Sequence, residues 1–227
     1  MQFSKQVKVT GLFYLALASA VTGLAAKHFP KASASTITPV FYQTLEHYEL
    51  FEGDQYVTLK QDAATEPEVK LFFTPYCKPC AVVHTPLKNI TKRAGLKFIE
   101  VPVNFGAIGK DIQESVYTAE SQGISEKFMA ELLGDIHHKR NAEPKSREDL
   151  AALIERCGGD ATKYRAGCEQ ARSYAENLDT LAKQYSINAT PTIVVNGNKQ
   201  INLHNLRSLA ELEFIIMSLS RNTGANS

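Results

Sequence analysis

The sequence has almost no net charge and lacks internal repeats and low-complexity tracts. Its 227 residues include 25 Lys and Arg against 24 Asp and Glu. This balance gives no electrostatic argument for a nucleic-acid partner or an acidic substrate. With 44% hydrophobic and 22% charged residues, the composition is that of a globular protein with a sizeable core. The function must therefore be inferred from a local site.

The long hydrophobic run near the start falls short of the roughly 20 residues that span a bilayer comfortably. Residues 11–26 form a charge-free run of 16 residues, preceded by Lys5 and Lys8 and ended by Lys27. This pattern predicts a signal peptide with a linker within residues 1–34; an uncleaved N-terminal anchor is the alternative. Because positive charge tends to remain inside, either form places the rest outside the cytoplasm. Small-residue cleavage sites occur at three places: residues 18–20, 23–25 and 32–34.

The four cysteines fall into two spacings. Cys77 and Cys80 have two residues between them, whereas Cys157 and Cys168 have ten. An even count at such spacings suits an oxidising compartment, which export supplies. In a reducing compartment the same residues would more often be metal ligands or catalytic thiols.

A strand–helix–strand pattern surrounds the first cysteine pair. Residues 69–73 form a short aromatic-rich apolar run, typical of a buried strand, and the helical pattern begins at Cys77 and ends at Gly95. Residues 97–105 return to a strand pattern, which predicts a βαβ unit with a parallel pair. The cysteine pair therefore opens a crossover helix.

The remaining pattern predicts further strands at both ends of the chain and helices between them. Folding is expected to begin near Val40, with a first strand within residues 46–60. Residues 192–202 predict a hairpin with a two-residue turn at Asn196 and Gly197. The other expected segments are helices at 112–122, 125–133, 148–156 and 171–185 within an all-helical insert at 106–185, a last helix at about 206–220, and a flexible tail at 221–227.

The position of Cys77 favours thiol–disulfide exchange. A thiol exchanges disulfides as its thiolate, and unpaired N–H groups and the positive end of the helix dipole face a sulfur at a helix start. Lys78 adds a nearby cation, and Pro79 is tolerated in a first helical turn. Half of a zinc site is one alternative, but Cys157 and Cys168 lack the paired spacing that would complete it. A structural disulfide is another, although closing so small a loop removes little unfolded-state entropy.

Four motifs in family order resemble the DsbA family: residues 51–59 (FEGDQYVTL), 72–80 (FFTPYCKPC), 103–105 (VNF) and 191–197 (PTIVVNG). The resemblance extends from about residue 45 to 220. It implies an α/β protein with a thioredoxin-like fold over residues 40–105 and 186–220, interrupted by the all-helical insert. In that fold the Thr190–Pro191 peptide is expected to be cis, with Thr190 and Pro191 binding an extended substrate segment.

The same resemblance implies a periplasmic dithiol oxidase that puts disulfides into reduced, unfolded exported proteins. A DsbB-like, quinone-linked membrane oxidase is the expected partner, and no cofactor, metal or nucleic acid is expected. A reductase or isomerase of the same fold is the alternative hypothesis. The Lys78-Pro79 dipeptide departs from the family's Pro-His, and its proline before the second cysteine resembles the dipeptide of thioredoxin. We therefore expect an intermediate redox potential. A non-catalytic metal- or peptide-binding module is a third possibility.

A second departure lies beneath the site. The buried acid that the family carries six residues before the first cysteine is Leu71 here, and the family's lysine partner aligns with Glu100. Glu100 is a candidate proton acceptor for Cys80, the alternative being a solvated edge carboxylate. His84 is expected to be partly exposed on the surface of its helix.

The second cysteine pair is expected to form a structural disulfide across a helical hairpin. For a loop of about a dozen residues, chain entropy predicts around 3 kcal/mol of stabilisation. Two unpaired buried thiols are the alternative. A second catalytic pair is disfavoured because neither Cys157 nor Cys168 follows a strand at the start of a helix.

Overall fold

The computed structural model describes residues 49–139 and 142–221. The predicted signal or anchor, its cleavage sites, the linker, the start of the fold near Val40 and nearly all of the tail lie outside the described residues. Within the described ranges, no helix combines the length and the apolar character needed to cross a membrane.

A mixed five-stranded sheet is built from both ends of the described chain. Its spatial order is β1-β5-β4-β2-β3, with β2 and β3 parallel and the other neighbours antiparallel. The strands are β1 (Tyr56–Thr58), β2 (Glu68–Phe73), β3 (Lys97–Pro102), β4 (Thr192–Val195) and β5 (Lys199–Ile201).

The central βαβ unit is the one predicted. Every residue of β2 is buried, as its continuous apolar pattern requires. Helix α2 (Lys78–Ala94) follows, and Gly95 ends it in the left-handed conformation with φ 67°, its N–H donating to the carbonyls of Thr91 and Lys92. The parallel register of β2 and β3 places Leu71 opposite Glu100.

The β4–β5 hairpin is also confirmed, but its turn is longer than predicted. Val195 pairs with Lys199, which leaves residues 196–198 as a three-residue loop. Asn196 and Gly197 both have positive φ, at 48° and 78°. A side chain at Gly197 would meet the Asp62 carbonyl oxygen at 2.9 Å. The close approach of this neighbouring segment therefore requires glycine.

The described residues between β3 and β4 contain helices and no strand, in agreement with the predicted insert. Helix α6 was not predicted, because its five residues are too short for a periodic pattern. The helices are α3 (Gly109–Ser121), α4 (Ser125–His137), α5 (Arg147–Arg156), α6 (Thr162–Ala166) and α7 (Glu169–Gln184).

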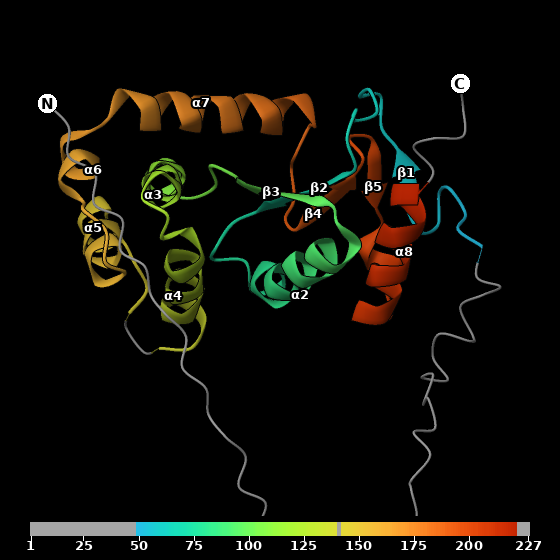
Figure 1. Ribbon diagram of the computed structural model, residues 1–227, viewed down its shortest axis with the longest axis horizontal. Helices are drawn as coiled ribbons and strands as arrows, with labels where there is room; N and C mark the ends of the chain where they lie inside the picture. Colours follow the sequence, from blue (N-terminus) through green and yellow to red (C-terminus); the bar gives the residue numbers. More distant parts are fainter. Residues whose placement is uncertain (1–48, 140–141, 222–227) are drawn as a thin grey trace, which may run out of the picture. The chain divides into compact units, whose positions relative to one another are not determined.

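Helices cover both faces of the sheet. Figure 1 shows α2 and α8 (Leu209–Arg221) on one face and α7 on the other; the short 3-10 helix η1 (Leu203–Asn205) precedes α8. The face toward α7 buries Phe72, Val101 and Val194 against Leu178 and Tyr185. The opposite face belongs to the larger apolar cluster.

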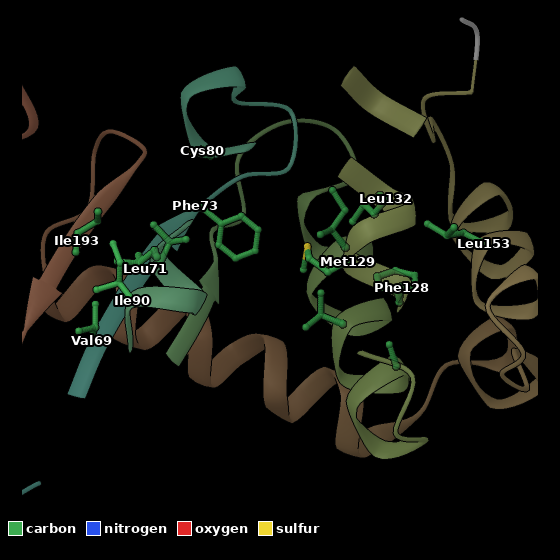
Figure 2. Close-up of a cluster of buried hydrophobic side chains, with 14 of the residues drawn as sticks. Val69, Leu71, Phe73, Cys80, Ile90, Phe128, Met129, Leu132, Leu153 and Ile193 are labelled. Carbon is green, nitrogen blue, oxygen red and sulfur yellow. The ribbon is translucent and has the colours of Figure 1, made fainter. Parts of the chain in front are cut away.

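The larger cluster joins the sheet to the helical insert without a break. Phe73, at the end of β2, lies between the sheet residues Leu71 and Ile193 and the α4 residues Met129 and Leu132 (Figure 2). All five side chains are at most 5% exposed. The segment that leads from β2 into α2 is therefore anchored in the core immediately before the cysteine pair.

Candidate active site

Cys77 lies at the N-terminus of α2. It is the N-cap residue, and its sulfur accepts a hydrogen bond from the Cys80 backbone N–H at 3.4 Å. Lys78 and Pro79 occupy the first turn and are exposed, and this turn contains no acidic residue. The backbone donor, the helix dipole and the lysine all favour negative charge on the sulfur. The Cys77 sulfur therefore faces a hydrogen-bond donor and a helix N-terminus with no acidic side chain beside it.

Cys80 lies in a different environment although it is only three residues away. Its side chain is fully buried, whereas Cys77 is partly exposed. Burial, with a smaller contribution from the hydrogen bond to Cys77, raises the pKa of the Cys80 thiol to about 12. Cys77 is therefore the sulfur that an incoming thiolate can reach, and Cys80 stays protonated in the reduced protein.

The loop before β4 lies directly against Cys77. The Thr190–Pro191 peptide bond is cis, which confirms the sequence prediction. The Cys77 thiol donates a hydrogen bond to the Thr190 carbonyl oxygen at 3.4 Å, across 113 positions of sequence. The structure thus brings together the cysteine pair and the two residues that were predicted to bind substrate.

Two hydrogen bonds tie the active-site loop to the helical insert. A ring N–H of His137, at the end of α4, donates to the Pro75 carbonyl at 2.7 Å, and the Tyr76 hydroxyl donates to the Pro144 carbonyl at 2.5 Å. No sequence pattern predicts either contact, because each joins residues more than 60 positions apart. They fix Thr74-Pro75-Tyr76 relative to the insert.

A pocket of about 430 Å³ lies between the active-site loop, the β3–α3 loop and the segment after α4. Tyr76, Phe105, Ile108 and Pro144 supply most of its apolar surface, and Phe105 is 40% exposed. Tyr76 immediately precedes Cys77. The residue that precedes the reactive cysteine therefore lines an apolar cavity with exposed aromatic surface.

Glu100 and His84 form a pair beneath the site. Glu100 Oε1 contacts the Nε2 atom of His84, and the two side chains are 16% and 6% exposed. The prediction that His84 lies on the surface is therefore wrong, because the β3 edge and the rings of Phe73 and Phe98 cover that face of α2. Glu100 is correspondingly not a solvated edge carboxylate. The spacing of four residues from Cys80 was the available signal.

The predicted disulfide between Cys157 and Cys168 is not formed. Both are free thiols, as are Cys77 and Cys80. Cys157 ends α5 and is buried, whereas Cys168 precedes α7, is partly exposed and donates its thiol proton to Gln170 Oε1 at 2.8 Å. The intervening turns and α6 direct the two sulfurs into different surroundings. The ten-residue spacing carries no information about these directions.

Across residues 49–139 and 142–221, no three His, Cys, Asp or Glu side chains come together as a ligand set. A tetrahedral zinc site needs two ligands beyond a cysteine pair. The arrangement that is present suits a cysteine pair that exchanges disulfides.

Comparisons with known proteins agree with this chemistry. A family model described as "Thioredoxin" matches residues 60–216. The DsbA thiol:disulfide interchange protein of Pectobacterium carotovorum subsp. carotovorum is 28% identical over 67% of this chain and 77% of its own length. The corresponding protein of Salmonella typhimurium is 26% identical, over 68% of this chain and 77% of its own.

Solved structures show the same fold. A peptide complex of Proteus mirabilis DsbA has a TM-score of 0.68 at 20% identity, covering 77% of this chain and 100% of that chain. A variant of Pseudomonas aeruginosa DsbA has a TM-score of 0.68 at 22% identity, covering 78% and 100%. These similarities confirm the predicted thioredoxin-like α/β fold with a helical insert. The chain belongs to the thioredoxin family, as a DsbA-like protein-disulfide oxidoreductase.

Proposed function

We propose that the protein is a periplasmic dithiol oxidase that introduces disulfides into reduced, unfolded exported proteins. The observation that carries this proposal is the position of the Cys77 sulfur at the start of α2, where it accepts a hydrogen bond from the Cys80 N–H in a turn without acidic residues. A sulfur stabilised as a thiolate is a good leaving group. Its release favours transfer of the disulfide to the substrate.

The reaction proceeds by two exchanges. A substrate thiolate attacks Cys77 in the oxidised pair, so the Cys77–Cys80 bond breaks and Cys80 leaves as a thiolate that takes up a proton. A second substrate thiolate then attacks the substrate sulfur of the mixed disulfide and releases Cys77. Two electrons pass from the substrate to the cysteine pair, and the substrate gains one disulfide.

Substrate binding uses the surroundings of Cys77. The backbone of Thr190 and Pro191 holds an extended segment, in the manner of strand addition. The pocket beside Tyr76 accepts apolar side chains of an unfolded chain. Neither feature selects a particular sequence, which suits an enzyme that acts on many unfolded chains.

Export and recharging complete the proposal. The lysines before the apolar run at residues 11–26, and the run itself, support export to the periplasm, where disulfides persist. The reduced pair is then reoxidised by a DsbB-like, quinone-linked membrane oxidase. Cell fractionation with an antibody against the protein tests the location, and recovery of the protein only in the cytoplasm would contradict it.

The activity is tested by mixing the oxidised protein with reduced, unfolded ribonuclease and counting the free thiols of the substrate with time. Each oxidised Cys77–Cys80 pair is expected to consume two substrate thiols and transfer one disulfide, at a rate proportional to the concentration of the protein. A reductase or isomerase is the second candidate, because Lys78-Pro79 places proline before the second cysteine. Titration of the pair against glutathione buffers separates them: a potential well above the thioredoxin value of about −270 mV supports the oxidase.

A further inference from the structure

A buried histidine lies one helical turn below Cys80. His84 follows Cys80 by four residues on α2, so the two side chains share a helix face, with Cβ atoms roughly 5–6 Å apart. The imidazole lies between the rings of Phe73 and Phe98, at centroid distances of 5.5 and 6.1 Å. Its Nε2 atom contacts Glu100 Oε1.

Cys80 has to exchange a proton that its surroundings hold tightly. Burial raises the pKa of its thiol to about 12, so the thiolate is scarce near neutral pH. Closing the disulfide nevertheless requires this sulfur to attack as a thiolate, and opening the disulfide releases it as one. Because the side chain is fully buried, solvent has no direct access to that proton. A nearby group must accept it and return it.

The groups around the imidazole leave Glu100 as its direct partner. Lys88, one turn further along α2, is engaged with Glu126 of α4 at 3.0 Å. Glu120 of α3 and Tyr174 of α7 are within electrostatic range of Glu100 and bond to each other. Leu71, opposite Glu100 on β2, is apolar. Because Nε2 contacts the carboxylate, Nδ1 is the imidazole atom left to accept a proton, and the partly exposed Glu100 connects the pair to solvent.

We propose that His84, held in place by Glu100, is the group through which Cys80 loses and regains its proton, directly or through one water. This inference rests on the proposed function. When the disulfide closes, the Cys80 S–H bond breaks, its proton passes to His84, and the sulfur attacks the mixed disulfide at Cys77 and expels the bound thiolate. When a substrate thiolate opens the disulfide, the proton returns to Cys80.

The two thiols can be observed separately in one stopped-flow experiment. The reduced protein is mixed with 5,5′-dithiobis(2-nitrobenzoate), and release of the thionitrobenzoate anion is followed. Attack by Cys77 releases the first anion and leaves a mixed disulfide, and attack by Cys80 on that disulfide releases the second. A protein with Cys77 and Cys80 both replaced by serine gives the contribution of Cys157 and Cys168, which is subtracted.

His84→Gln is expected to slow the second phase about tenfold or more at pH 7, since general-base assistance contributes about 10²–10⁴. The first phase should change by less than about twofold, because it involves no proton from Cys80. The second-phase rate in the variant should also rise more steeply with pH than in the wild type, toward about tenfold per pH unit, as thiolate formation becomes limiting. His138→Gln, at the exposed C-cap of α4, is the matched control and should leave both phases unchanged.

Glu100→Gln provides a second variant that keeps a hydrogen-bonding partner for the imidazole while removing the charge. It should slow the second phase by a smaller factor and leave the first phase unchanged. An unchanged second phase and pH profile in both variants would overturn the relay, and so would an equal slowing of both phases. A wild-type first phase no faster than that of a free cysteine would instead contradict the proposed function, and this inference with it.

Discussion

Two cysteines in this protein lie at the N-terminus of a long helix, and only one of them has an activating environment. Cys77 precedes α2 and Cys168 precedes α7, a helix of 16 residues. The sulfur of Cys77 accepts a hydrogen bond from the Cys80 backbone N–H, and the first turn of α2 contains no acidic residue. The sulfur of Cys168 receives no capping bond, donates to Gln170, and has Glu169 beside it in the first turn.

The two helix termini therefore differ in the hydrogen bonds and charges that they present to the sulfur. The difference arises from what surrounds the terminus: a second cysteine whose N–H donates to the first, and the Thr190 carbonyl, which limits where the sulfur can lie. The tertiary structure supplies the second feature through the loop before β4.

The largest effect is expected from exchanging the reactive sulfur. Cys77→Ser should reduce transfer of disulfides to reduced ribonuclease to the uncatalysed rate, because the serine hydroxyl cannot form the mixed disulfide. Cys168→Ser is the matched control and should retain the full rate. Thiol counting over time measures both. Residual catalysis by Cys77→Ser would assign the chemistry to another cysteine.

The next effect concerns Cys80 and pH. A folded-state pKa of about 12, above the unfolded value of about 8.5, means that the folded protein retains a proton which the unfolded chain releases. The stabilisation is present in full below pH 8.5 and is lost as pH rises toward 12. Between pH 9 and 10, the unfolding free energy of the reduced protein should fall by about 1.4 kcal/mol more than that of Cys80→Ala. Parallel urea-unfolding curves for the two proteins would contradict the raised pKa.

A smaller change is expected from placing an acid beside Cys77. Lys78→Glu removes one cation and introduces a carboxylate into the first turn of α2. The first turn of α7 has such a carboxylate at Glu169, and that of α2 has none. A charge in the first turn contributes about 0.3–1 kcal/mol, so alkylation of Cys77 at pH 6 should slow by roughly two- to fivefold. Lys78→Gln, which removes only the cation, should give an intermediate rate. Equal rates for all three proteins would show that the helix start does not control the thiolate.

The smallest effect is expected at the second cysteine pair. Because Cys157 and Cys168 are free, Cys168→Ser should alter the unfolding free energy by less than about 0.5 kcal/mol, as at other surface positions. The oxidised wild-type protein should contain one disulfide, between Cys77 and Cys80. Mass spectrometry after alkylation under denaturing conditions counts the remaining thiols. A second disulfide that joins Cys157 to Cys168 would restore the original sequence prediction.

The sequence predicted the elements that depend on local pattern. The β2–α2–β3 unit follows from an apolar run, a helical period and a second strand run, and the cis peptide at Pro191 followed from the family resemblance. The features that the sequence did not predict depend on how helices and side chains are oriented in the folded structure. His84 is buried because β3 and Phe98 cover one side of α2, and the sulfurs of Cys157 and Cys168 diverge because of how α5, α6 and α7 are oriented. The turn at Asn196 is one residue longer than predicted because Val195 pairs with Lys199. This register of β4 and β5 is set within a sheet in which β5 also pairs with β1.

Phe73 lies in an apolar cluster that belongs equally to the sheet and to the helical insert. The interior of helices α3 to α6 is therefore continuous with the core on this face of the sheet. On heating, the sheet and the helical insert should unfold together in a single cooperative transition. The surface around the Cys77 sulfur is therefore intact whenever the molecule is folded. A substrate chain binds to a surface that needs no prior assembly.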